Sequence, residues 1–287
     1  MAAEGVAQVQ ELMAEVLPAP DVPVPERRRA YDELLAHFPP PESVAFEAVD
    51  VDGVPGYWVF DEQADPAPVT LYLHGGAYGL CSVRTHANAI ARIASASGGR
   101  VLGIDYRLAP EHPFPAAVDD TVTAYRWLLR EGIDPAQVVV AGDSAGSGLA
   151  LALLNVLREA GEPFPAGVVA ICPWVDLADP AQAGTSLERY GGFYLNGADP
   201  ANVLASPING GFAGFPPLLI EAGGADGLLA QAEQLADKAS AAGVDVQLNV
   251  WPGMIHVWHL FAPVIPDGTQ VNERIGQWIR ETATMRN

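Results

Sequence analysis

The sequence predicts an α/β fold in which a mostly parallel sheet of eight strands carries helices on both faces. Eight short apolar runs, bounded by glycine, proline or aspartate, have the length and composition of strands. Between the later runs lie segments whose apolar residues recur at helical spacing, and this alternation is typical of a parallel sheet. With 287 residues, 49% of them hydrophobic, the chain can form one large domain over residues 1–287.

The expected strands are short, and several are rich in valine and isoleucine. In chain order they are Ser43–Val51, Tyr57–Phe60, Val69–Leu73, Val101–Ile104, Val138–Ala141, Val168–Cys172, Pro217–Ala222 and Val246–Trp251. The helices expected between and after them are Thr85–Ser97, Ala116–Arg130, Ser144–Ala160, Leu228–Ala242 and Val271–Thr284. Ligands of open parallel sheets bind beyond the carboxyl ends of the strands, so the loops that follow the strands are where a site is expected.

Two segments lie outside this alternation. Residues 1–42 contain two helical patterns, Val6–Leu17 and Pro25–His37. Residues 177–215 are rich in glycine, proline and aspartate. We expect both segments to lie over the working edge of the sheet or along its flank.

Charge and composition exclude several classes of function. The formal net charge of −20 would repel a nucleic-acid backbone or an anionic lipid surface. Residues 1–20 lack the regions of a signal peptide, and no stretch reaches 18 uncharged apolar residues, so we expect a soluble, cytoplasmic protein. Cys81 and Cys172 lack the spacing of a disulfide framework or a zinc site and are expected to be small buried residues.

The stretch VVVAGDSAGSGLALALL, residues 138–154, places polar, flexible residues between two apolar elements. Gly142-Asp-Ser-Ala-Gly146 fits G-x-S-x-G, in which Ser144 occupies a sharp, strained turn from a strand into a helix. A plain helix N-cap is the alternative role for this serine. The glycines do not fit G-x-G-x-x-G, and G-x-x-x-x-G-K-[ST] is absent from the sequence, which argues against a phosphate-binding loop.

A serine hydroxyl is a weak nucleophile and needs a base that is itself oriented by an acid. With G-x-S-x-G, the expected order along the chain is serine, acid and then histidine, each after a strand. Asp226 follows the seventh expected strand, and His256 opens a short Pro-Gly loop after the eighth. We therefore expect Asp226 to be the acid and His256 the base.

Other residues compete for these two roles. His259 lies one helical turn beyond His256, and a partly buried structural role suits it better. Asp176 also follows a strand and is the second choice for the acid. Asp245 precedes its strand and therefore lies at the wrong end of the sheet.

The run His74-Gly-Gly-Ala-Tyr78 follows the third expected strand and should face Ser144. We expect the backbone N–H groups of Gly76, Ala77 and Ala145 to converge on a developing oxyanion, because fixed amide donors stabilise such charge. A plain Gly-Gly turn is the alternative. The combination with the G-x-S-x-G turn favours the donor role.

In combination, these motifs resemble the hormone-sensitive lipase family of α/β-hydrolases, the bacterial esterases with an HGGG loop. The resemblance covers nearly the whole chain and rests on five runs: His74–Tyr78, DYRLAPEHPFPAAVD at 105–119, Gly142–Gly146, PWVD at 173–176 and PGMIH at 252–256. It implies the α/β-hydrolase fold with a small cap, formed by the 1–42 arm and by residues 177–215.

The resemblance also implies the roles of individual residues. It makes Ser144 the nucleophile, His256 the base and Asp226 the acid. It places an oxyanion hole at Gly75, Gly76, Ala77 and Ala145, and substrate contacts at Tyr78, Trp174, Ile255 and Val257. No cofactor or metal is expected. A homodimer that forms through the last strand and the last helix is expected.

Within the family, Ser82-Val-Arg-Thr-His86 and Ile255-His-Val-Trp258 are similar to the branch that includes monoterpene ε-lactone hydrolases. In the 105–119 run we expect a structural role, with Arg107, Glu111 and Asp119 pairing to hold the loop behind the serine turn. Asp143 should brace that turn, and His74 should fix the oxyanion loop by hydrogen bonding.

The sequence departs from the family in two places. Ala77 replaces a third glycine and should crowd the acyl side of the pocket by one methyl group. The stretch between Asp176 and Pro207 is shorter than expected, which predicts a more open pocket. The arm residues expected either to line the pocket or to pack the arm onto the sheet are Met13, Val16, Leu17, Tyr31, Leu34 and Leu35.

These observations predict a serine carboxylesterase that cleaves small to medium neutral esters through an acyl-enzyme. The acidic composition would discourage anionic esters, although the charge of the pocket itself decides this. A lactone hydrolase on the same residues is the alternative. A non-catalytic receptor for a small molecule is the remote one, since Ser144, Asp226 and His256 are all present.

Overall fold

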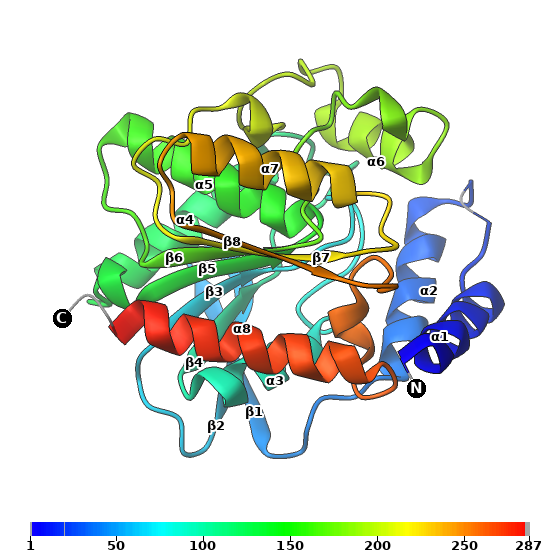
Figure 1. Cartoon of the computed structure of the whole chain (residues 1–287), viewed down its shortest axis with the longest axis horizontal. Coiled ribbons are helices and arrows are strands. Elements are labelled where there is room, and N and C mark those ends of the chain that lie inside the picture. Colours follow the sequence, from blue (N-terminus) through cyan, green and yellow to red (C-terminus); the bar gives the residue numbers. More distant parts are fainter. Residues whose placement is uncertain (1, 20, 285–287) are drawn as a thin grey trace.

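One central sheet organises the chain, and the computed structural model describes residues 2–19 and 21–284 (Figure 1). In this part of the chain the sheet has eight strands in the order β1-β2-β4-β3-β5-β6-β7-β8. Pairing is antiparallel for β1 with β2 and for β2 with β4, and parallel for the rest. The predicted fold class is therefore confirmed.

The strands and helices lie close to their predicted positions. The strands are β1 Val44–Val51, β2 Val54–Asp61, β3 Val69–Leu73, β4 Arg100–Ile104, β5 Val138–Asp143, β6 Gly167–Ile171, β7 Leu218–Gly223 and β8 Val246–Trp251. The helices are α1 Ala2–Val16, α2 Val24–Ala36, α3 Ala87–Ser97, α4 Ala116–Arg130, α5 Ala145–Ala160, α6 Ser186–Leu195, α7 Leu229–Ala241 and α8 Pro266–Thr284.

Two differences from the sequence prediction have local causes. β2 begins at Val54 rather than Tyr57, because Asp52 and Gly53 both adopt positive φ (53° and 89°) and close a tight hairpin. Helix α6 was not predicted. Its start carries a capping signature that identifies it, since the Thr185 side chain accepts a hydrogen bond from the Leu187 N–H at 3.2 Å.

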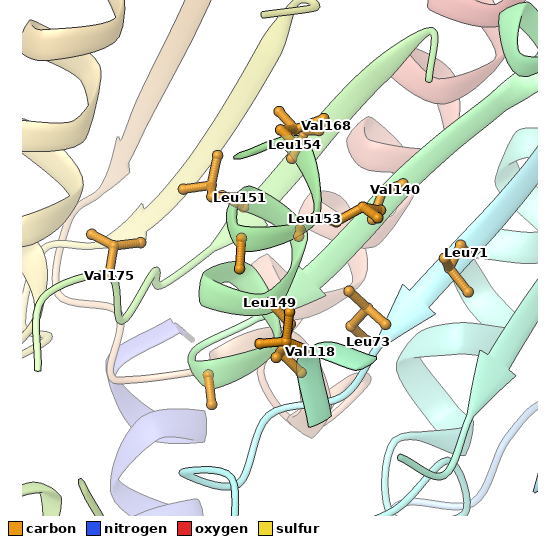
Figure 2. Packing of buried hydrophobic residues seen from close by; sticks show 14 of the residues in the cluster. Leu71, Leu73, Val118, Val140, Leu149, Leu151, Leu153, Leu154, Val168 and Val175 are labelled. Carbon is orange, nitrogen blue, oxygen red and sulfur yellow. The ribbon is translucent and has the colours of Figure 1, made fainter. Parts of the chain in front are cut away.

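Alternating side chains of the buried strands feed two apolar layers. In β5, Val138 and Val140 join the cluster that contains α4, α5 and α7, whereas Val139 and Ala141 join the cluster that contains α3 and α8. Figure 2 shows part of the first layer, in which leucines of α5 pack beside Leu73 of β3 and Val140 of β5. Burial on both faces explains why these strands read as continuous apolar runs.

The parallel strands end together at one edge of the sheet. In the register of the pairs, Leu73 at the end of β3 lies opposite Gly142, and Asp143 at the end of β5 lies opposite Ile171. The loops that follow β3, β5, β6, β7 and β8 therefore start at the same edge. The arm helices α1 and α2 lie at this side of the molecule, with α6 above them (Figure 1).

The turn from β5 into α5 requires glycine. A Cβ added at Gly146 would lie 1.9 Å from the carbonyl oxygen of Leu73, and one at Gly142 would lie 2.5 Å from the backbone of Gly146. Helix α5 thus begins in direct backbone contact with the end of β3. This contact brings the N-terminus of α5 next to the loop after β3.

We expect Gly146→Ala to lower the free energy of unfolding by about 1–3 kcal/mol, because the added methyl group forces the helix away from β3. Gly192→Ala in α6 is the matched control, since a Cβ there meets nothing within 4 Å. That substitution should stabilise the helix by roughly 0.5–1 kcal/mol. Urea unfolding of both variants measures the difference, and equal stability of the two would contradict the close contact.

Candidate active site

Ser144 sits on a strained turn between β5 and α5. Its φ and ψ are 51° and −115°, a conformation that a residue other than glycine adopts only when its surroundings impose it. Two backbone hydrogen bonds impose it here: the Ser144 N–H donates to the Ile171 carbonyl at 2.8 Å, and the Ser144 carbonyl accepts from Trp174 N–H at 3.1 Å. The turn is therefore tied to the end of β6.

The loops after β7 and β8 bring Asp226 and His256 to this serine. The His256 Nε2 atom lies 3.0 Å from Ser144 Oγ, and His256 Nδ1 lies 2.9 Å from Asp226 Oδ2. Burial by itself raises the pKa of the Asp226 carboxyl, but the hydrogen bond and charge of His256 outweigh it and hold this pKa below its usual value. An ionised Asp226 fixes the proton of His256 on Nδ1 and leaves Nε2 free to accept the serine proton.

The rival residues lie elsewhere. His259 is fully buried, and its Nε2 atom lies 3.2 Å from the Tyr72 hydroxyl. The Asp176 side chain accepts from the N–H of Ala178 at 2.9 Å and so closes its own turn. Of these alternatives to Asp226 and His256, neither reaches Ser144 by a hydrogen bond that the structure records.

The loop after β3 turns sharply beside Ser144. Gly76, Ala77 and Tyr78 all have positive φ, at 110°, 52° and 59°. Gly76 and Ala77 line the same cavity as Ser144. Ala145 is the first residue of α5, where a backbone N–H has no acceptor within the helix.

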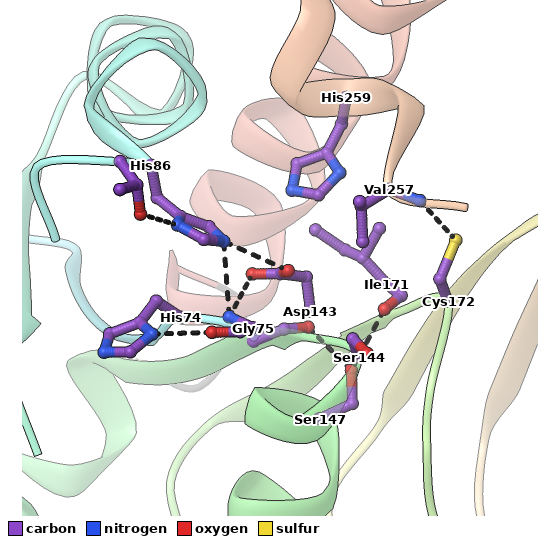
Figure 3. Close-up of polar contacts among 12 residues, drawn as sticks. His74, Gly75, His86, Asp143, Ser144, Ser147, Ile171, Cys172, Val257 and His259 are labelled. Carbon is purple, nitrogen blue, oxygen red and sulfur yellow. Dashed lines mark hydrogen bonds and ion pairs between the residues drawn. The ribbon is translucent and has the colours of Figure 1, made fainter. Parts of the chain in front are cut away.

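The prediction that Gly75 donates to an oxyanion is wrong. Its N–H is already used, because it donates to Asp143 Oδ1 at 3.0 Å within the cluster of Figure 3. A side chain at this position would meet the Asp143 carboxylate at 2.2 Å. Gly75 is therefore an anchor of the loop, and Asp143 braces it from the serine turn.

His74 also acts within this loop, as expected. Its Nδ1 atom lies 2.7 Å from the Gly75 carbonyl, which accepts a hydrogen bond from it. Its ring stacks on Tyr106 with centroids 4.2 Å apart. These contacts hold the turn from the side opposite the serine.

A cavity of about 430 Å³ opens at Ser144 and is mainly apolar. The arm contributes Met13, Arg27, Tyr31, Leu34 and Leu35 to its wall. The segment 177–215 contributes Asp179, Ala181, Gln182, Thr185, Ser186, Leu187 and Tyr190. Val16 and Leu17, which were also candidates from the arm, do not line it.

The open pocket that the short segment predicted is not found at the serine. Ser144 is 3% exposed, and residues from both cap segments line the cavity that contains it. The side chain of His256 is 38% exposed, so the site meets solvent on the histidine side. Helix α6 contributes Ser186, Leu187 and Tyr190 to the wall of this cavity.

Three of the four predicted substrate contacts are wrong. Tyr78 is buried and stacks on Tyr194 with centroids 3.8 Å apart. Trp174 is fully buried beside Tyr78, and Ile255 packs into the core on the α3 and α8 side of the sheet. Val257 does line the cavity. Sequence position next to a motif could not reveal which way these side chains face.

The ion pairs of the 105–119 run also differ from the prediction. Arg107 pairs with Asp120 at 2.7 Å rather than with Asp119. Glu111 pairs with Arg28 of α2 at 2.7 Å, and Arg28 also donates to the carbonyl oxygens of Gly79 and Ala109. The run therefore fastens the arm beside the loop after β3, through residues 83 positions apart that no local pattern pairs.

Cys172 is buried next to Asp226 and His256. Its sulfur accepts a hydrogen bond from Val257 N–H at 3.3 Å. Atoms of Cys172, Asp226 and His256 that could bind a metal lie within 4.8 Å of one another. Asp226 and His256 already bond to each other at 2.9 Å, so a metal ion here would displace that bond.

Comparison with known proteins agrees with this geometry. A family model described as the α/β-hydrolase fold matches residues 70–260. The chain belongs to this α/β-hydrolase family. The hydrolase is 42% identical over 273 residues to an acetyl-hydrolase of Streptomyces hygroscopicus, with 91% of each chain covered. It is 36% identical to esterase LipU of Mycobacterium tuberculosis, over 74% of this chain and 77% of that one.

Comparison with solved structures identifies the family of the hydrolase more narrowly. An esterase from the bacterial hormone-sensitive lipase family superimposes with a TM-score of 0.93 at 41% identity, over 97% of this chain and 98% of its own. The resemblance to the hormone-sensitive lipase family is thus confirmed, and the narrower similarity to lactone hydrolases stays a prediction. None of the described helices is long and apolar enough to cross a membrane.

The buried histidines predict a pH-dependent stability. Burial lowers the pKa of His259 to about 4, so the folded protein keeps this ring neutral at pH values where the unfolded chain protonates it. Stability from this residue is present above pH 6.5 and is lost as the pH falls toward 4. Between pH 7 and 5.5 the loss is about 1 kcal/mol for one such histidine.

We therefore expect the stability gap between the wild type and His259→Gln to narrow by about 1 kcal/mol between pH 7 and 5.5. Urea unfolding at the two pH values measures it. His112→Gln provides the control, because it removes a histidine that is exposed in the folded protein. A gap that stays constant or widens on acidification would show that His259 is not buried as a neutral ring.

Proposed function

We propose that the protein is a serine carboxylesterase that cleaves small to medium neutral esters through an acyl-enzyme on Ser144. One observation carries this proposal: the chain of hydrogen bonds from Ser144 Oγ through His256 to Asp226, which opens onto a mainly apolar cavity. The esterase and acetyl-hydrolase names of the relatives support it.

Acylation begins when Ser144 Oγ attacks the ester carbonyl and His256 Nε2 takes the serine proton. The carbonyl oxygen becomes negative and is stabilised by the N–H groups of Gly76, Ala77 and Ala145. Asp226 stabilises the imidazolium that forms on His256. The histidine then gives its proton to the departing alcohol, and the acyl group remains on Ser144.

Deacylation repeats the cycle with water as the nucleophile. The exposed side of His256 lets water reach Nε2, which takes its proton while the water oxygen attacks the acyl carbonyl. Collapse of the tetrahedral intermediate returns the proton to Ser144 Oγ and releases the acid. The same residues could open a lactone, and a substrate panel separates the two classes.

The cap completes the site in this proposal. The arm and the segment 177–215 supply most of the apolar wall that would hold the acyl and alcohol groups. A homodimer through β8 and α8 stays a prediction. This prediction is supported by β8, which lies at the edge of the sheet and carries Val250 with 41% of its surface exposed. The cytoplasmic location also stays a prediction.

Ser144→Ala should lower kcat for p-nitrophenyl acetate and butyrate by at least about 10⁴-fold, because the nucleophile is lost while the fold is kept. Initial rates with these esters, with the decanoate and with ε-caprolactone measure both the loss and the preferred class. Ser147→Ala, three residues further along in α5, is the matched control. The Ser147 hydroxyl donates to the Gly142 carbonyl rather than facing the cavity. Turnover that survives in Ser144→Ala would refute the proposal.

Arg28→Met should raise KM for the same esters about threefold to tenfold and change kcat little, because the arm loses its bonds to the Gly79 and Ala109 carbonyls. Steady-state kinetics over a range of ester concentrations measure this. Glu111→Gln keeps both carbonyl bonds and should change KM less, since the ion pair is partly exposed. An unchanged KM in Arg28→Met would mean that the arm does not shape the pocket.

A further inference from the structure

His86 is a buried residue that the proposed reaction does not use. It ends the Ser82–His86 run, is the N-cap residue of α3, and is 1% exposed. Together with Asp143, it lines the cavity that contains Ser144. Figure 3 shows His86 pointing toward Asp143 and Gly75 behind the serine turn. Its two ring nitrogens have different partners, and these partners determine where its protons are.

The Nδ1 atom of His86 faces hydrogen-bond acceptors. It lies 2.9 Å from Thr85 Oγ1 and 3.2 Å from the carbonyl oxygen of Ser82. The single proton of the Thr85 hydroxyl is donated to the same Ser82 carbonyl at 2.8 Å. Thr85 Oγ1 can therefore only accept from His86, and a carbonyl oxygen can only accept. Nδ1 must carry a proton.

The Nε2 atom faces a carboxylate. It lies 3.2 Å from Asp143 Oδ2, while Asp143 Oδ1 accepts from the Tyr72 hydroxyl at 2.9 Å and from Gly75 N–H at 3.0 Å. The Gly75 N–H also points toward Nε2 at 3.3 Å, but its nearer acceptor is Asp143 Oδ1 at 3.0 Å. A carboxylate that already accepts two hydrogen bonds leaves Nε2 to act as a third donor.

Two other buried histidines nearby, His74 and His259, each have a hydrogen-bond partner at one ring nitrogen only among the described residues. His74 donates from Nδ1 to Gly75, and its Nε2 has no partner in the described part of the chain. His259 contacts the Tyr72 hydroxyl through Nε2, and its Nδ1 likewise has none. Burial lowers the pKa of His74 to about 3 and that of His259 to about 4, so both rings are neutral. Of these three rings, His86 has acceptors at both nitrogens.

We propose that His86 is an imidazolium whose charge neutralises Asp143 beside Ser144 and which, through Asp143, positions the oxyanion loop. The charge of His86 is inferred from hydrogen bonding alone. The expected effect on kcat rests on the proposed esterase function. The titratable groups around His86 are Asp143 on β5, Tyr72 and His74 on and after β3, Asp105 after β4, and His259 in the 3₁₀ helix at 258–261.

The ion pair matters because Asp143 is the neighbour of the nucleophile. An isolated buried carboxylate at this position would repel the negative charge that develops on the substrate oxygen. The cation on His86 cancels that repulsion before the reaction begins. Asp143 is then free to hold the Gly75 amide, which sets the position of Gly76 and Ala77. His86 is thus a positioning residue that acts through Asp143.

NMR spectroscopy of ¹⁵N-histidine-labelled protein tests the charge without any substrate. At pH 7.5 both ring nitrogens of His86 should carry protons and resonate as an imidazolium, whereas His74 and His259 should show one bare nitrogen each. The signals are assigned by their loss in His86→Gln, His74→Gln and His259→Gln. A neutral His86 ring would overturn the proposal.

Kinetics test the consequence. His86→Gln should lower kcat for p-nitrophenyl acetate about 10-fold to 100-fold and change KM less than about threefold, because the Asp143 charge is left uncompensated in the transition state. Adding Asp143→Asn removes that charge and keeps an oxygen for Gly75, so the double variant should regain at least about fivefold in kcat. A double variant no faster than His86→Gln would overturn the charge compensation.

His259→Gln is the matched control, because it also removes a fully buried ring from the same cluster. The His259 ring contacts Tyr72 rather than Asp143. It should lower kcat less than His86→Gln does. Urea unfolding of all variants separates kinetic effects from loss of fold, and the NMR result stands if a variant does not fold. Activity that survives Ser144→Ala would refute the esterase function but leave the NMR result intact.

Discussion

The close approach of the α5 N-terminus to the end of β3 is the constraint on which the site depends. Only glycine at position 146 allows it, since a Cβ there would lie 1.9 Å from the Leu73 carbonyl oxygen. This contact places Ser144 on a strained turn and sets Asp143 beside the loop after β3. Ser144 and the loop after β3 are thus held together by one close contact between two neighbouring strands.

The chain is strongly acidic, but the aspartates near this contact lie next to histidine rings. The net charge is −20, yet Asp143 and Asp226 each face an imidazole, at 3.2 Å and 2.9 Å. The two pairs serve different ends in the proposed chemistry: His256 must gain and lose a proton, whereas His86 keeps its charge. Their surroundings explain the difference. Nε2 of His256 faces the Ser144 hydroxyl, which can donate a proton, whereas both nitrogens of His86 face acceptors.

The cap depends on contacts that are distant in sequence. Arg28 fastens α2 to the carbonyl of Gly79, in the loop after β3, and to that of Ala109. Helix α6 supplies Leu187 and Tyr190 to the opposite wall of the cavity. Residues of both cap segments therefore line the cavity at Ser144, and its shape is set by how two separate segments dock on the same sheet edge.

Local pattern alone determined the strands, most helices and the order of Ser144, Asp226 and His256, because apolar periodicity and glycine spacing are properties of neighbouring residues. The resemblance of the motifs to one family added the expectation of a cap and of individual substrate contacts. Only the tertiary structure decided that Tyr78 and Trp174 face the core, that Gly75 binds Asp143, and that Arg107 pairs with Asp120. These outcomes depend on side-chain direction and on contacts between distant segments, which the packing of helices against the sheet settles.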